Sequence, residues 1–197
     1  MVFSMRARDY RAVARERLQG QWGTMILLSF VYSLIVNAIS FISGIGMYII
    51  GGPLIVGLAL AYLKVIRGDK PEFNDLFSGF DRFGGNLTTY LLHTLYTFLW
   101  SLLFIPIFIK PFSYALTFYI RVDNPDIGAD DAITLSRQMM DGYKWKLFCL
   151  RLSFIGWAFL SILTLGIGFF FLTPYMEAAN AAFYEERKRE WNSGQTI

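Results

Sequence analysis

The chain has 197 residues, of which 55% are hydrophobic and 18% aromatic, whereas 17% are charged. Together with a mean hydropathy of +0.43, this composition excludes an ordinary soluble domain and indicates an integral membrane protein. The single cysteine, Cys149, excludes an intramolecular disulfide and a Cys-x-x-Cys metal site. We expect one all-α membrane domain over residues 1–197, with no cofactor or metal and with no nucleic acid among its partners.

The N-terminal segment, residues 4–20, carries five arginines and precedes an apolar run. This run is too long for the apolar core of a signal peptide and lacks a convincing cleavage site, so we interpret it as an uncleaved first spanning helix. One helical face of the N-terminal segment collects Ala7, Tyr10, Ala14 and Leu18. That pattern is typical of a basic amphipathic helix at a lipid surface, although a loop with apolar residues tucked in is the alternative.

Several apolar runs approach the roughly 18 to 20 residues that a helix needs to cross about 30 Å of hydrocarbon. These runs cover residues 22–41, 47–63, 87–109, 147–165 and 168–184. Glycines precede Pro53 and Pro174, and we expect tight turns or kinks at Gly44, Gly46, Gly51, Gly52, Gly166 and Gly168. From each proline onward the second helices are too short to span. We favour kinked spans that begin before the proline over helices that do not fully span.

A threefold internal repeat organises the chain, with repeats at about residues 5–68, 72–124 and 129–190. Each third contains a glycine beside an aromatic residue, an apolar run, a proline, a second apolar run and then charges. The glycine-to-proline spacings are 33, 32 and 32 residues for Gly20–Pro53, Gly79–Pro111 and Gly142–Pro174. This pattern predicts a polytopic bundle of three tandem helical hairpins, about six membrane segments, with short interfacial helices. The three glycines should form equivalent corners between interfacial and spanning helices.

The positive charges predict the orientation. Of 18 lysines and arginines, all except Lys110 lie in the N-terminal segment, the 64–82 loop, the 121–151 region or the charged C-terminal segment. Since positive residues favour the cytoplasm, we expect a multi-pass protein of the bacterial cell membrane. Both termini and both long loops should be cytoplasmic, with the hairpin turns outside.

Lys110 is the exception, because it lies beside Pro111 inside an apolar stretch. An intramembrane charge predicts a functional site by default, here for an anionic group such as a lipid phosphate or for a buried acid. The alternative is a lysine whose ammonium reaches the outer head groups.

Glu177 is the second candidate, because it lies three residues after Pro174 in an apolar segment where acids are costly. It could pair with Lys110 or relay protons, and a hydrated acid near an interface is the alternative. Arg151 and Tyr114 complete the ligand-binding candidates, although Arg151 lies near a helix end and is expected to snorkel. For His93, the sole histidine, a structural hydrogen bond is favoured over a metal site. No residues are assigned to catalysis.

The C-terminal half contains "DNP", "SRQMMDGYK", "LSFIGW" and "LGIGFFFLTPY" in order, and the N-terminal half contains "GPLIVGLALAYLKVIRG". Over nearly the whole chain these motifs resemble the bacterial membrane family called domain of unknown function 975. "IPIFIKPFSY" departs slightly from that pattern in its turn residues. The resemblance implies a polytopic membrane protein without an established activity, distantly like the membrane domain of some glycerophosphodiester phosphodiesterases. It supplies no catalytic residues.

Three classes of function compete. The leading hypothesis is a non-catalytic module that binds a membrane lipid, anionic in nature, or a hydrophobic amphipathic peptide in a groove between hairpins. A small transporter or channel that uses the proline breaks is the alternative. An intramembrane enzyme is disfavoured, because no acid, base or metal cluster converges in the sequence. The sequence does not predict the oligomeric state.

Overall fold

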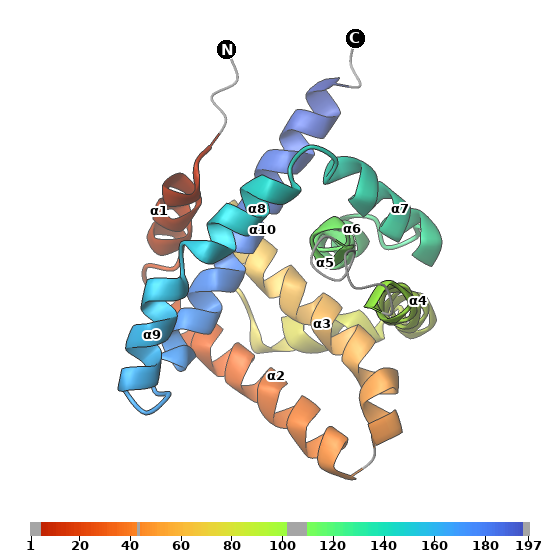
Figure 1. Ribbon diagram of the computed structural model, residues 1–197. Coiled ribbons are helices and arrows are strands. Elements are labelled where there is room, and N and C mark those ends of the chain that lie inside the picture. Colours follow the sequence, from red (N-terminus) through yellow and green to blue (C-terminus); the bar gives the residue numbers. More distant parts are fainter. Residues whose placement is uncertain (1–4, 43, 102–109, 195–197) are drawn as a thin grey trace.

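The computed structural model describes residues 5–42, 44–101 and 110–194, and within these ranges the chain is helical without strands (Figure 1). In chain order the helices are α1 (Ala7–Arg17), α2 (Trp22–Ile42), α3 (Gly44–Arg67), η1 (Phe73–Phe80), α4 (Phe83–Ser101), α5 (Lys110–Ser113), α6 (Thr117–Asp123), α7 (Ala129–Met139), α8 (Lys144–Leu152), α9 (Ile155–Leu163) and α10 (Phe169–Gly194). The expected all-α class is confirmed.

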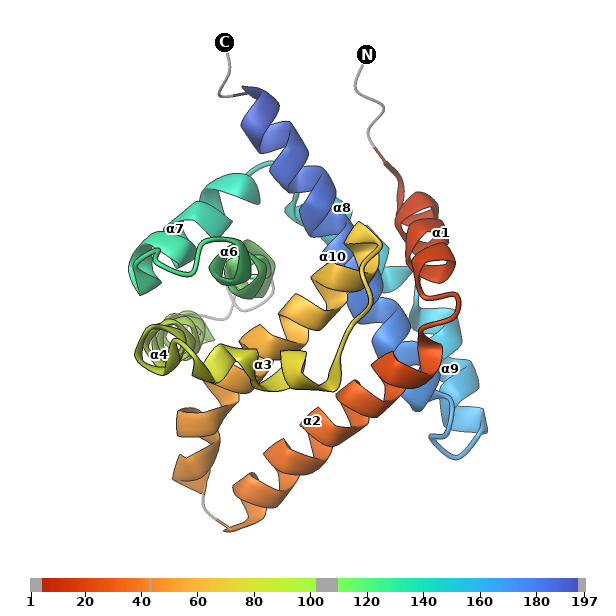
Figure 2. The same ribbon diagram turned by 180° about the vertical axis from the view of Figure 1, so that it is seen from behind.

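Helix α3 lies at the centre and contacts α2, η1, α4, α6 and α10. The α2–α3 and α9–α10 turns point to one end of the molecule, whereas α1 and the C-terminal part of α10 lie toward the other (Figures 1 and 2). Helices α4 and α6 are seen nearly end-on in both views, so they run across α3 and α10. The middle pair is therefore not parallel to the other two, and the fold does not establish six spans in three like hairpins.

Among the described residues, three stretches are long and apolar enough to cross a membrane: Trp22–Phe41, Gly46–Arg67 and Lys144–Leu163. The third joins α8 to α9 through a turn at residues 153–154. Large apolar side chains stay uncovered near these stretches, with Phe159 67% exposed and Leu165 96% exposed. Hydrocarbon is the solvent that suits such a surface, which supports a membrane protein.

Two prolines lie inside helices, as the favoured interpretation of the broken segments predicts. Pro53 lies within α3 and Pro174 within α10, and both helices begin before the proline. The middle segment differs, because α5 ends at Ser113 and α6 begins at Thr117. The expected turn before Pro174 is present, with φ of +53° at Leu165 and +89° at Gly166.

Of the expected tight turn or kink at Gly51 and Gly52, the turn is absent, since both residues lie inside α3 just before Pro53. A Cβ on Gly52 would lie 2.8 Å from the Tyr90 Cβ, and one on Gly57 would lie 2.2 Å from the Leu76 carbonyl oxygen. These glycines therefore allow α4 and η1 to approach α3 at backbone distance. A small residue in a helix and a small residue in a turn look alike in sequence.

The three predicted corner glycines do not share a setting. Gly20 and Gly142 have φ of +77° and +76°, which an L side chain rarely adopts, and each has open space around it. Gly79 instead lies inside η1, where an added Cβ would meet the Pro53 carbonyl oxygen at 2.0 Å. The prediction of three equivalent corners is wrong for Gly79, although the internal repeat itself stays a prediction.

The amphipathic faces fold as helices, but protein covers them. In α1, Tyr10, Ala14 and Leu18 are fully buried, and the Tyr10 ring lies 5.3 Å from the Phe183 ring of α10. In η1, by contrast, Phe77 stays 40% exposed. Helical periodicity reports a buried face without telling protein from lipid.

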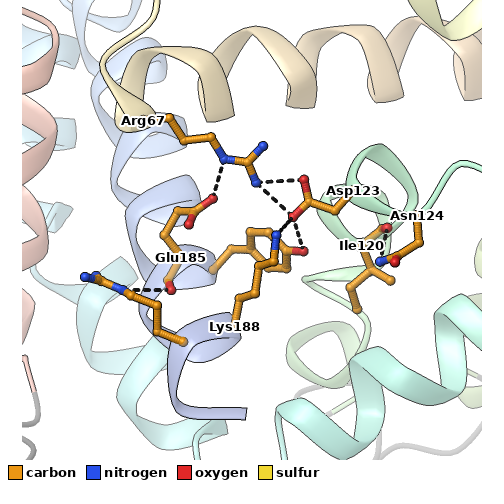
Figure 3. Close-up of polar contacts among 8 residues, drawn as sticks. Arg67, Ile120, Asp123, Asn124, Glu185 and Lys188 are labelled. Carbon is orange, nitrogen blue, oxygen red and sulfur yellow. Dashed lines mark hydrogen bonds and ion pairs between the residues drawn. The ribbon is translucent and has the colours of Figure 1, made fainter. Parts of the chain in front are cut away.

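Charged side chains join α3, α6 and α10 near the end that carries the C-terminus (Figure 3). Arg67 Nη2 lies 2.7 Å from Asp123 Oδ1, and Arg67 Nε donates to Glu185 Oε1 at 2.7 Å. Asp123 Oδ2 accepts from Lys188 Nζ at 2.6 Å and from the Tyr184 hydroxyl at 2.8 Å. We call these five residues the Asp123 cluster.

The Asp123 cluster holds its central acid ionised. Burial by itself raises the pKa of Asp123, but hydrogen bonds from Lys188, Arg67 and Tyr184 outweigh it, so the pKa lies below its usual value. The cluster is therefore an ionic connection between helices that are distant in sequence.

Candidate functional site

The bundle encloses a cavity of about 360 Å³ between α2, α3, α10 and the α4–α8 region. Its lining residues are Ser29, Tyr32, Ser33, Ile55, Leu58, Ala59, Tyr62, His93, Pro111, Tyr114, Ala115, Leu116, Phe118, Tyr119, Leu147, Arg151, Thr173, Glu177 and Asn180. Three of the four predicted ligand-binding residues are among them: Glu177, Arg151 and Tyr114. A concave site with mostly apolar walls and a few convergent polar groups is typical of a binding site.

Glu177 is the acid of this cavity, and α10 places it there about 12 Å from the helix start at Phe169, at about 1.5 Å per residue. Its side chain is partly buried. Its Oε2 accepts long hydrogen bonds from the Tyr119 hydroxyl at 3.5 Å and from Asn180 Nδ2 at 3.4 Å. Within the described part of the chain, no lysine or arginine lies within ion-pair distance of Glu177.

Tyrosine hydroxyl groups surround the acid. Tyr32, Tyr62 and Tyr119 come from three different helices and are close enough to interact electrostatically with Glu177. The Tyr62 hydroxyl is 2.7 Å from the Ser29 hydroxyl, which donates to the Met25 carbonyl at 2.8 Å. Ser29 therefore orients Tyr62 from the neighbouring helix.

Arg151 and Tyr114 reach the cavity in different ways. Arg151 is exposed, and its guanidinium carbon lies 5.2 Å from the centre of the Phe112 ring, a distance typical of a cation–π contact. Tyr114 is 2% exposed, and its ring lies 5.8 Å from His93 in an edge-on arrangement. Arg151 is thus an exposed cation at the edge of the site, and Tyr114 is part of its wall.

His93 also lines the cavity, with its ring centre 5.0 Å from that of Phe118 in a tilted arrangement and a hydrogen bond to the Tyr114 backbone. The predicted structural hydrogen bond is confirmed. Among the described residues, no three His, Cys, Asp or Glu side chains gather as a metal site would require.

Lys110 begins α5, but its side chain lies outside the described part of the structure. The predicted Lys110–Glu177 pair therefore stays a prediction. The neighbouring Pro111 does line the cavity, so the backbone at the start of α5 lies beside the site.

The sequence analysis did not identify Tyr32, Tyr62, Tyr119 or Ser29 as residues of the site. Each lies on an apolar helix, where tyrosine is as common at the membrane interface as in a binding site. Their helical spacing gives one signal: Ser29, Tyr32 and Ser33 lie on one face of α2, and Leu58, Ala59 and Tyr62 on one face of α3. That spacing predicts faces, but it does not tell which faces meet.

A family model described as "Protein of unknown function (DUF975)" matches residues 5–109 and 102–190. Searches of curated proteins and of solved structures found no match. The likeness to the membrane domain of glycerophosphodiester phosphodiesterases stays a prediction. The family match covers both halves of the chain, including every helix that builds the cavity, and the chain belongs to the DUF975 family.

Proposed function

We propose that this protein is a non-catalytic membrane protein that binds an aminophospholipid, with the lipid amine beside Glu177. The observation that supports this most is an acid in a bundle cavity whose hydrogen bonds come from Tyr119 and Asn180 and which, among the described side chains, has no lysine or arginine at ion-pair distance. A carboxylate away from water is costly unless a positive group or a proton joins it. An ammonium group would offset that cost.

The rest of the cavity suits the same ligand. Aromatic rings and hydroxyl groups of Tyr32, Tyr62 and Tyr119 favour an ammonium group through cation–π contacts and hydrogen bonds. Arg151 supplies a guanidinium for the phosphate of the head group. Apolar walls such as Ile55 and Leu58 suit the glycerol and the first methylenes of the chains.

The topology proposed with this function places both termini in the cytoplasm of a bacterial cell. The α2–α3 and α9–α10 turns would lie outside, and α4 to α6 would be embedded as the middle hairpin. The charge asymmetry of the sequence supports this orientation.

The test is native mass spectrometry of the detergent-purified protein with phosphatidylethanolamine as the probe. The parent should retain one molecule of this lipid, whereas the same lipid with its amine acetylated should be lost. Glu177→Gln should abolish the preference for the free amine. Glu16→Gln, an exposed change on α1, should leave it intact.

Equal retention of both lipids by the parent would contradict the proposal. A co-purified hydrophobic peptide that the amine lipid does not displace would favour the peptide hypothesis instead.

A small proton-coupled transporter is the second candidate, because an acid without an ion-pair partner in the described region can also carry a proton. Proteoliposomes settle this choice. Transport of the lipid or of protons across the vesicle that Glu177→Gln stops would favour the transporter.

A further inference from the structure

A second hollow lies on the outside of the bundle, between α1, α2, α9 and α10. Its volume is about 470 Å³, and it is lined by Arg15, Trp22, Trp157, Leu160, Ser161, Thr164, Gly168, Phe171, Leu172 and Tyr175. None of these residues lines the cavity around Glu177. We call this hollow the α1 groove.

The α1 groove is cationic at one end. Arg15 is exposed, and its Nη2 donates a long hydrogen bond of 3.5 Å to the Tyr175 hydroxyl. Arg11 lies one turn earlier on α1, and its Nε is buried without a hydrogen-bond partner. In the described part of the chain, neither arginine pairs with a carboxylate. Arg11 Nη1 donates to the Ser153 carbonyl at 3.1 Å and its guanidinium lies over the Phe154 ring, so Arg15 is the guanidinium that lines the groove and has donors to spare.

The remainder of the groove is apolar. From Arg15 it runs past Trp22 and Trp157 along Leu160 and Phe171. Leu160 and Phe171 are 53% and 56% exposed, so they form an uncovered wall on the outside of the bundle.

The hydroxyl groups in the groove are occupied within the protein. Ser161 donates to the Trp157 carbonyl and Thr164 to the Ser161 carbonyl, both at 2.8 Å.

From Trp157 to Thr164 the lining helix rises about 10 Å at 1.5 Å per residue, enough for roughly eight methylenes at about 1.25 Å each along an extended acyl chain.

We propose that the α1 groove binds an anionic membrane phospholipid, with its phosphate at Arg15 and one acyl chain along α9 and α10. Charge complementarity identifies the head group, since guanidinium groups match phosphate oxygens with two parallel hydrogen bonds. The apolar wall identifies the chain. Tryptophans at the level of Arg15 suit the boundary between head group and chain.

Binding is measured by native mass spectrometry of the full-length protein with three probes: phosphatidylglycerol, phosphatidylcholine of the same chains, and inorganic phosphate. The parent should retain phosphatidylglycerol over phosphatidylcholine. Arg15→Gln should weaken this binding by about tenfold, because a charge-assisted hydrogen bond is lost. Arg8→Gln removes the same charge from an outward position on α1, where the side chain is 74% exposed, and should change binding less than about twofold.

The chain part of the site has its own pair of variants. Leu160→Trp adds bulk inside the groove and should also weaken binding by several-fold. Leu163→Trp adds the same bulk on the same helix at a residue that is 79% exposed and does not line the groove, so it should not. Arg15 is exposed and Leu160 is 53% exposed. Their variants should therefore fold, which a thermal melt verifies.

Three results would overturn the proposal. Equal loss of binding in Arg8→Gln and Arg15→Gln would reduce it to general attraction between a basic helix and an anionic surface. Inorganic phosphate that competes as well as the lipid would indicate a soluble-anion site, and an unchanged Leu160→Trp would remove the acyl chain from the groove. Glu177→Gln should leave phosphatidylglycerol binding intact, so failure here and failure of the aminophospholipid site are separate outcomes.

Discussion

Replacing Gly57 with alanine should destabilise the protein, although alanine is the better helix former. In the middle of a helix this exchange ordinarily gains about 0.5 to 1 kcal/mol. At Gly57, however, the new Cβ would lie 2.2 Å from the Leu76 carbonyl oxygen and 2.6 Å from that of Asp75. Ordinary contact begins at 3.4 Å, so η1 would have to move by about 1 Å.

The obstacle is backbone rather than a flexible side chain, which puts the overpacking cost near the upper end of the usual range, about 3 kcal/mol. Subtracting the gain in helix propensity leaves a net loss of about 2 kcal/mol, or about 4 to 8 °C in Tm for a chain of this size. The assay is thermal unfolding in a mild detergent followed by circular dichroism.

Gly23→Ala is the matched control, because an added Cβ on this α2 residue has nothing within 4 Å. It should melt at or slightly above the parent temperature. If Gly57→Ala behaves like Gly23→Ala, then η1 does not lie against α3 at backbone distance, and the account of glycine packing along α3 is refuted.

Asp123→Asn should destabilise by about 1 to 3 kcal/mol in denaturant unfolding, less than a fully buried pair because Arg67 and Lys188 are 34% and 37% exposed. Asp126→Asn, at a carboxylate that is 87% exposed, should change little. The lowered pKa of Asp123 means that its contribution is full above its usual value near 3.8 and is lost as pH falls through the folded value. A parent and an Asp123→Asn variant that lose stability in parallel below pH 4 would contradict this assignment. In a Cys149→Ser background, single cysteines at Gly44 and Gly166, in the two hairpin turns, should react with an impermeant reagent from outside. Single cysteines at Asp69 and Asp130, in the cytoplasmic loops, should be protected. The reverse labelling pattern would invert the topology.

Local patterns predicted the parts of the fold that depend on local chemistry. The apolar face of α1 follows from spacing, since one buried face fixes the period. The helices that continue through Pro53 and Pro174 follow from length, because the segments after the prolines are too short to span. These expectations needed no knowledge of which helices touch.

Contacts between distant segments were not predictable in the same way. Gly57 packs against a segment about 20 residues later, and a glycine in sequence does not tell packing from turning. Arg67 pairs with Asp123, 56 residues later, and with Glu185, 118 residues later. The sequence does not predict these pairs, because an arginine or lysine near the end of a span can bind lipid head groups instead.

The sequence analysis identified charged residues of the candidate site but not the tyrosines that lie beside them. Glu177 and Arg151 stand out because charged residues are costly in apolar segments. Tyr62 and Tyr119 do not, because an apolar helix tolerates tyrosine without any ligand. The cavity that joins them is lined by seven helices, α2 to α6, α8 and α10, and that geometry is absent from any single segment.

The Asp123 cluster bears on how the protein is made. A ribosome delivers α3 and α6 long before α10, so Arg67 and Asp123 enter the membrane without Glu185 and Lys188. Arg67 and Asp123 can pair with each other before α10 is made. Until α10 arrives, however, Arg67 lacks Glu185 and Asp123 lacks Lys188, so the earlier helices have no ionic connection to the C-terminal segment. Assembly is thus completed from the C-terminus, after synthesis ends. A chain that stops before α10 would be inserted yet unfinished, and its loosely held helices would be exposed to quality-control proteases.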